Sequence, residues 1–233
     1  MKGKPSAGVI AAGEGSRFRR SGVATAKPLI PVGGLPLVGH VLRNFSLAGI
    51  GRAVVIFNES EEDCVRWVRR NPSGLELEII VKSTKSSFES FWRVGRALGP
   101  GDHLISTVDA LCAPEDLKKV LEEPGPADLV LGLTRRVEDE KPLWVEWDAV
   151  TGAVSRIGPP AGREATAGIY RVSDSLFREA PAEEFPSLRA WLKRTAEAGA
   201  KVRGVLLGDV FDVDDPSDLK AAEDFFRRAK TSS

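Results

Sequence analysis

The stretch AGVIAAGEGSRF, residues 7–18, places a short run of small and branched apolar residues directly before a glycine-rich turn. The apolar run predicts a buried strand, and the glycines predict a tight turn from that strand into a helix. Backbone N–H groups in such a turn can point at an anion, because glycine has no side chain to obstruct it. Arg17 can bind phosphate oxygens through paired hydrogen bonds, and Lys27, which precedes Pro28, adds a compact second cation. The stretch therefore predicts a phosphate-binding loop after the first strand.

Two familiar phosphate motifs do not fit this stretch. The dinucleotide-binding fingerprint needs a third glycine where Phe18 stands, and the Walker loop needs a Gly-Lys-Ser/Thr sequence. A tight turn with Arg17 in solvent would be enough to explain a lone pair of glycines. The following Lys27–Pro28 pair favours the phosphate-binding interpretation instead. The candidate phosphate-binding residues here, which the family resemblance given below marks as nucleotide-binding, are Ala11, Ala12, Gly13, Gly15, Ser16, Arg17 and Lys27.

Short apolar runs alternate with helical segments along the first half of the chain. Strands that alternate with helices predict a mostly parallel sheet covered on both faces. After about residue 143 the pattern changes to two short strands around a Thr-Gly turn, then a strand, a helix, a strand and a final helix. We therefore expect one α/β domain over residues 1–233 with a small β-rich insertion. The apolar runs of the first half cover residues 7–12, 52–57, 75–81, 103–108 and 127–133.

The charge of the chain is balanced, with 33 basic and 33 acidic side chains among 233 residues. This balance provides no global field that would attract nucleic acid or an anionic membrane, so any anion site has to be local. No apolar run approaches the length of a membrane span, and the amino terminus does not read as a signal peptide. Cys64 and Cys112 lack CxxC spacing, which disfavours a disulfide framework or a zinc site. We expect a soluble, cytoplasmic protein that binds neither nucleic acid nor membrane.

Residues 11–18, AAGEGSRF, and 27–42, KPLIPVGGLPLVGHVL, closely resemble the amino-terminal signature of the sugar-phosphate nucleotidyltransferases. This is the NTP-transferase family with a glycosyltransferase-A-like fold, and the resemblance extends over the whole chain. It implies a three-layer α/β/α, Rossmann-like fold with a mostly parallel mixed central sheet. Residues 1–135 would form the nucleotide-binding half, and residues 136–233 the half that binds the acceptor and closes the site. In that family the glycine loop wraps the triphosphate, while an Arg and a Lys stabilise the departing pyrophosphate.

Three aspartates are candidate ligands for Mg²⁺. Asp109 follows an apolar strand, and ligands of open α/β sheets bind at the carboxyl ends of strands. A helix cap or a surface position would explain Asp109 taken alone, but family members place a metal-binding Asp at this strand end. The segment DVDDPSDL, residues 212–219, resembles the family's second acidic motif, in which Asp212 or Asp214 would complete the metal site. Asp215 is expected to cap the last helix.

The sequence departs from the family pattern at two places. Ser86 and Ser87 stand where many relatives have a turn that contacts the nucleobase, so they are candidate nucleotide-binding residues, with an ordinary helix N-cap as the alternative. Gly168 lies in a strand that resembles the family's G-I-Y strand, where the glycine lets the sugar approach the backbone. The lysine that often precedes this strand and holds the sugar phosphate is missing, and Arg163 or Lys141 could substitute for it.

The resemblance implies a magnesium-dependent nucleotidyltransferase of the NDP-sugar pyrophosphorylase type, with Arg17, Lys27 and Asp109 as catalytic residues. It would transfer a nucleoside monophosphate from a nucleoside triphosphate to a sugar phosphate, or a similar phosphorylated acceptor, and release pyrophosphate for NDP-sugar biosynthesis. Enzymes like molybdenum-cofactor guanylyltransferase or phosphocholine cytidylyltransferase would share these motifs, and a catalytically silent nucleotide-binding regulator is a third alternative. A glycosyltransferase of the same fold usually carries a D-x-D motif, which this strand end lacks. The base, the acceptor and the oligomeric state stay open, and family members often form homo-oligomers.

Overall fold

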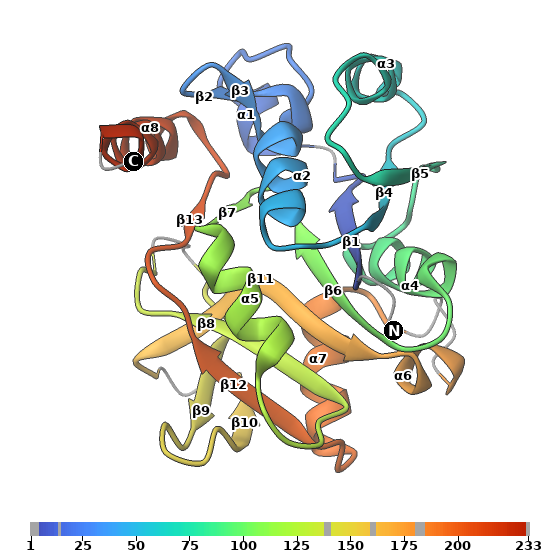
Figure 1. Cartoon of the computed structure of the whole chain (residues 1–233), viewed down its shortest axis with the longest axis vertical. Helices are drawn as coiled ribbons and strands as arrows, with labels where there is room; N and C mark the ends of the chain where they lie inside the picture. The colour runs from blue at the N-terminus through green and yellow to red at the C-terminus, as the bar shows by residue number, and fades with distance from the viewer. Residues whose placement is uncertain (1–4, 14, 138–140, 159–161, 180–184, 232–233) are drawn as a thin grey trace.

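The central feature of the fold is one mixed β-sheet. A computed structural model describes residues 5–13, 15–137, 141–158, 162–179 and 185–231. Nine described strands form the sheet in the order β10-β9-β11-β6-β1-β4-β5, with β8 joining β11 to β12 (Figure 1). The strands are β1 (Ser6–Ala11), β4 (Arg52–Phe57), β5 (Glu76–Val81), β6 (Asp102–Thr107), β8 (Leu129–Thr134), β9 (Trp144–Trp147), β10 (Val154–Ile157), β11 (Glu164–Ser173) and β12 (Val202–Leu206).

Strand β1 lies at the centre of the parallel part of this sheet. It pairs in parallel with β4 and β6, and β4 pairs in parallel with β5 at the edge. A side chain at Gly8 would place its Cβ 2.1 Å from Cγ1 of Val94. The glycine therefore allows a helix to pack directly on the middle of β1, because any larger residue would clash with it.

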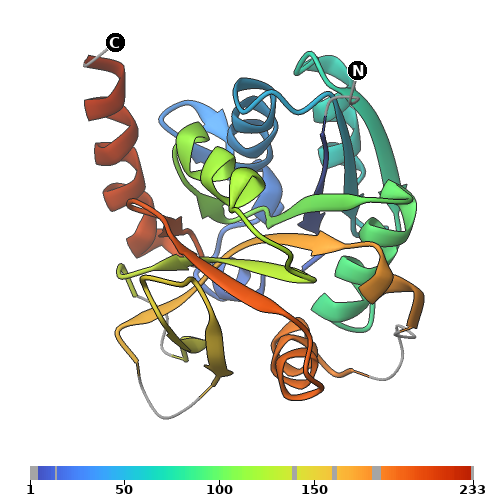
Figure 2. The ribbon, with the colours of Figure 1, turned by 60° about the horizontal axis from the view of Figure 1, so that its bottom comes forward.

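Helices cover both faces of the sheet, as Figure 2 shows from the side. Val9 of β1 is buried in a core with α2, α3 and α5, and Ile10 is buried on the opposite face with α4 and α7. This alternation follows from the two-residue period of a strand. The main helices are α2 (Leu37–Leu47), α3 (Glu62–Arg70), α4 (Ser87–Leu98), α5 (Pro114–Glu122), α6 (Ser175–Glu179), α7 (Leu188–Glu197) and α8 (Pro216–Thr231).

The predicted fold class is confirmed. All five apolar runs of the first half form strands of the sheet, namely β1, β4, β5, β6 and β8. The Thr-Gly turn joins β9 to β10, and this antiparallel hairpin extends the main sheet by pairing with β11. The described helices include none long and apolar enough to cross a membrane. Cys64 and Cys112 are buried free thiols.

Candidate functional site

The glycine loop leads from the carboxyl end of β1 into the short helix α1 (Ser16–Arg20). Gly15 has a φ of 58°, in the left-handed region that glycine tolerates best. A Cβ at Gly15 would also lie 2.9 Å from Cβ of Lys27, so glycine lets the loop pass close over this lysine. The Phe18 ring is 1% exposed and anchors α1 in the core. Local sequence thus fixes the place from which Arg17 extends.

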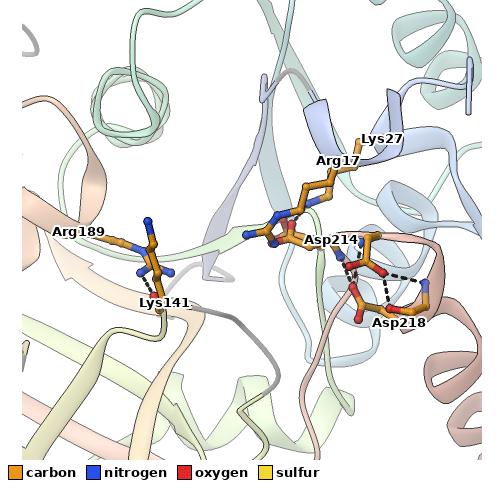
Figure 3. A network of polar contacts seen from close by, with 9 residues as sticks. Arg17, Lys27, Lys141, Arg189, Asp214 and Asp218 are labelled. Carbon is orange, nitrogen blue, oxygen red and sulfur yellow. Dashed lines mark hydrogen bonds and ion pairs between the residues drawn. The ribbon is translucent and has the colours of Figure 1, made fainter. Parts of the chain in front are cut away.

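Lys27 is the centre of a network of ion pairs. It begins the 3-10 helix η1 (Lys27–Leu29), and its Nζ donates to Oδ2 of Asp109 at 2.5 Å and also to Oδ1 of Asp214. A guanidinium nitrogen of Arg17 donates to Oδ2 of Asp214 at 2.5 Å. Figure 3 shows both cations directed at Asp214, with Asp218 on its other side. The two predicted catalytic cations therefore meet the predicted metal-binding carboxylates.

Burial and charge set the protonation of this network. Burial alone would lower the pKa of Lys27, but the charges of Asp109 and Asp214 outweigh it and raise that pKa. Burial would raise the pKa of Asp109, and the charge of Lys27 together with its hydrogen bond lowers it instead. Lys27 is therefore cationic and Asp109 anionic at neutral pH.

The three predicted acidic residues come together in space. Asp109 follows β6 and precedes β7 (Ala110–Leu111), which pairs with β13 (Phe211–Asp212) and brings Asp212 opposite Ala110. One carboxylate oxygen from each of Asp109, Asp212 and Asp214 lies within 4.8 Å of the others. Both residues that the sequence left as alternatives, Asp212 and Asp214, thus belong to the cluster. Carboxylate oxygens are ligands that Mg²⁺ prefers, so the donor set fits this ion.

The first turn of α8 holds the acidic cluster in place. The backbone N–H groups of Asp214 and Asp215 donate to Oδ2 of Asp218, at 2.8 and 2.9 Å. The backbone N–H of Ser217 donates to Oδ1 of Asp215 at 2.7 Å, which confirms Asp215 as a cap of α8. Asp214 is thereby fixed through its own backbone.

A cavity of about 530 Å³, here called the loop cavity, opens beside the glycine loop. Every residue that the sequence predicts to bind nucleotide lines this cavity. Ser86 also caps α4, because its Oγ accepts from the N–H of Glu89, and Oγ of Ser87 accepts from the N–H of Leu188. The helix-cap alternative is confirmed for Ser86, both serines line the cavity, and nucleotide contact by either one stays a prediction. The lining residues are Ile10, Ala11, Ala12, Gly13, Gly15, Ser16, Arg17, Lys27, Pro28, Thr84, Lys85, Ser86, Ser87, Ser90, Thr107, Val108, Asp109 and Asp214.

A second cavity of about 240 Å³, here called the β11 cavity, lies on the other side of the carboxylates. Gly168 lines it with a φ of 74°, and its contact with an acceptor stays a prediction. Lys141 and Arg163 are exposed and are not among its lining residues. Residues that the sequence analysis missed line it instead, among them Arg136 and Arg189. An arginine just past a strand or in a first helical turn resembles an ordinary surface residue, so local patterns gave no signal for either.

The two cavities meet at the acidic cluster. Ser87, Thr107, Asp109 and Asp214 line both of them. Two ligands bound in the two cavities would therefore approach each other at these residues. A three-layer α/β/α fold with two adjoining cavities at the carboxyl ends of its strands, where open α/β sheets bind ligands, fits a transferase that binds two substrates.

The comparisons with known proteins give the family. A family described as "MobA-like NTP transferase domain" matches residues 7–157, and the chain belongs to it. An inositol-1-phosphate CTP transferase from T. maritima superposes with a TM-score of 0.82 at 21% identity, over 96% of both chains. The family match confirms the resemblance to the nucleotidyltransferases, and the superposition confirms the fold.

Curated relatives match with moderate identity. A CMP-5'-(3-aminopropyl)phosphonate synthase from Streptomyces rubellomurinus is 24% identical over 92% of this chain. A 2-C-methyl-D-erythritol 4-phosphate cytidylyltransferase from Pelotomaculum thermopropionicum is 31% identical over 51% of this chain. The matched regions span 38% and 51% of these two relatives, respectively.

Proposed function

We propose that this protein transfers a nucleoside monophosphate from a nucleoside triphosphate to a phosphorylated small molecule and releases pyrophosphate. The observation that carries the proposal is the meeting of the loop cavity and the β11 cavity at Asp109 and Asp214. A triphosphate in the loop cavity and an acceptor in the β11 cavity would meet there. The acceptor oxygen could then attack the α-phosphorus in line, without a covalent enzyme intermediate.

The chain's own residues supply positioning and charge neutralisation. The backbone N–H groups of the glycine loop and the guanidinium of Arg17 would bind the triphosphate, and Lys27 would neutralise charge that grows on the departing pyrophosphate. Asp109, Asp212 and Asp214 would hold Mg²⁺, for which their oxygens form a suitable donor set. When bound, this ion would withdraw charge from phosphate oxygens as a Lewis acid.

CTP and a non-nucleotide phosphate or phosphonate are the first substrates to test. The relatives described above are a CTP transferase, a cytidylyltransferase and a CMP-phosphonate synthase, which supports cytosine as the base. The family resemblance keeps sugar 1-phosphates, and with them an NDP-sugar pyrophosphorylase activity, among the acceptors. A panel should therefore combine CTP, UTP, GTP, ATP and dTTP with sugar phosphates, inositol phosphate, phosphocholine and aminoalkyl phosphonates.

Substitution of Lys27 and Asp109 tests the proposed roles. Lys27→Ala and Asp109→Asn should each lower the rate of pyrophosphate release by on the order of 100-fold, because each removes a charge needed in the transition state. Lys82→Ala is a suitable control, since Lys82 pairs with Glu59 on the surface and lines neither cavity. Undiminished rates in both site variants would refute these assignments. Nucleotide binding without pyrophosphate release for any acceptor would favour a catalytically silent regulator.

A further inference from the structure

Arg136 is held in a defined position at the edge of the acidic cluster. It follows β8, and its backbone N–H donates to Oγ1 of Thr134 at 3.0 Å. Its guanidinium carbon lies 4.2 Å from the centroid of the Phe211 ring. Arg136 and Asp212 also line the same cavity, which places the charge of Arg136 on the side of the cluster that faces this cavity. A guanidinium over an aromatic face is attracted to it and loses orientational freedom.

The position of Arg136 separates it from the cations that face the nucleotide. Arg17 and Lys27 line the loop cavity, whereas Arg136 lines the β11 cavity and not the loop cavity. Asp109, Asp212 and Asp214 line the β11 cavity as well. A phosphate that enters this cavity must approach three carboxylates, and Arg136 supplies a positive charge on that side in addition to the magnesium ion that these carboxylates would hold.

Arg189 is the other arginine in the lining of the β11 cavity, and it has a structural task. It lies in the first turn of α7, and its guanidinium donates to the backbone carbonyl of Lys141. Figure 3 shows this contact across from Arg17 and Lys27. Arg189 therefore ties the wall of the cavity together, while Arg136 is placed by the element that carries Asp212.

We propose that Arg136 binds the phosphate or phosphonate of the acceptor. The inference rests on the proposed function. A planar guanidinium can donate two parallel hydrogen bonds to one oxyanion group, and the contact with the Phe211 ring limits how far the group can move. Arg136 should therefore select acceptors that carry a tetrahedral oxyanion group, and uncharged alcohols of similar size should not bind.

Inorganic phosphate is the probe for this site. The full chain is first saturated with Mg²⁺ and a non-hydrolysable triphosphate, chosen by thermal shift, so that the loop cavity is filled. Phosphate is then titrated by calorimetry onto the wild type, Arg136→Gln, Arg136→Lys and, as a control, Arg163→Gln. We expect at least tenfold weaker phosphate binding in Arg136→Gln, an intermediate loss in Arg136→Lys, and no change in Arg163→Gln. Affinity for the triphosphate should be the same in all four proteins.

Kinetics with any acceptor found in the panel provide a second readout. Arg136→Gln should raise the acceptor KM at least tenfold and leave the triphosphate KM unchanged, which a general loss of structure would not do. Equal phosphate affinity in the wild type and Arg136→Gln, or no phosphate binding to the filled wild type, would overturn the inference. Arg136→Lys keeps the charge, so its phosphate affinity provides the test if Arg136→Gln does not fold. If no triphosphate binds at all, the proposed function fails, and a loss of phosphate binding specific to the Arg136 variants would still support the anion site.

Discussion

Glu61 is a buried acid with no role in the proposed reaction. Glu61 directly precedes α3 and is 4% exposed. Neither of its carboxylate oxygens has a hydrogen-bond partner within the described part of the chain. Burial raises the pKa of Glu61 to about 7, and the charge of Arg19 opposes this shift only in part. The folded protein therefore holds a proton on Glu61 more tightly than the unfolded chain does.

This shift predicts a pH-dependent loss of stability. A pKa raised by folding contributes stability at low pH that disappears as the pH rises through the folded value, here about 7. Glu61→Gln cannot ionise, so its free energy of unfolding relative to the wild type should increase by about 2 kcal/mol between pH 5 and pH 8. Urea unfolding at both values measures the difference. Glu62→Gln, at an exposed neighbouring position, should show no such change, and parallel pH profiles for the wild type and Glu61→Gln would contradict the prediction.

At the scale of elements, β11 depends on glycine where it lies beside the end of β6 and the start of β7. A Cβ at Gly168 would lie 2.6 Å from Oγ1 of Thr107 and 3.2 Å from Cβ of Ala110, and the backbone there has a φ of 74°. Thr107 and Ala110 flank the turn that carries Asp109. The close contact therefore links the path of β11 to the position of Asp109, a proposed magnesium ligand.

Gly168→Ala should cost both stability and activity. Positive φ alone costs an alanine about 1 kcal/mol, and the overlap with Thr107 should add about 1–3 kcal/mol. Gly49→Ala is a matched control, because Gly49 has a φ of 86° but a Cβ added there would meet no atom within 4 Å. Thermal or urea unfolding should show a larger loss for Gly168→Ala, and only this variant should slow pyrophosphate release. Equal losses would mean that β11 can shift without strain.

The sequence predicted elements better than the contacts between them. Short runs rich in branched residues, such as RAVVIF, favour a buried strand, and the strands and the fold class were confirmed. Asp109 and Lys27 were identified because a family signature marks them. The stacking of Arg136 on Phe211 joins two distant segments, and no periodicity in either segment indicates it. The division into two functional halves stays a prediction, as do the cytoplasmic location and the homo-oligomer.

At the scale of the whole molecule, the ion-pair network joins the two ends of the chain. Arg17 and Asp214 are separated by 197 positions and are in direct contact. A triphosphate that binds Arg17 and Lys27 must break the ion pairs that these two residues form with Asp109 and Asp214. A magnesium ion that binds these carboxylates must break the same ion pairs. Each ligand therefore releases the groups that the other one needs, and their binding should be positively coupled and reciprocal.

Removal of magnesium tests this coupling in the wild type and in Asp214→Asn. The wild type should bind the triphosphate about tenfold or more tightly with Mg²⁺ than in EDTA, since coupling free energies between sites are typically about 1–3 kcal/mol. Asp214→Asn removes a carboxylate that competes with the triphosphate for Arg17 and Lys27. It should therefore bind the triphosphate more tightly than the wild type in EDTA and gain less from Mg²⁺.

Calorimetric titrations with and without the metal measure all four affinities in this test. Asp209→Asn serves as the control, because Asp209 is exposed and lines neither cavity, so this variant should keep the coupling of the wild type. Weaker triphosphate binding by Asp214→Asn in EDTA would mean that Asp214 organises Arg17 and Lys27 for the triphosphate. In that case the contact between Arg17 and Asp214 would serve to build the site, and ligand binding would not need to break the ion-pair network.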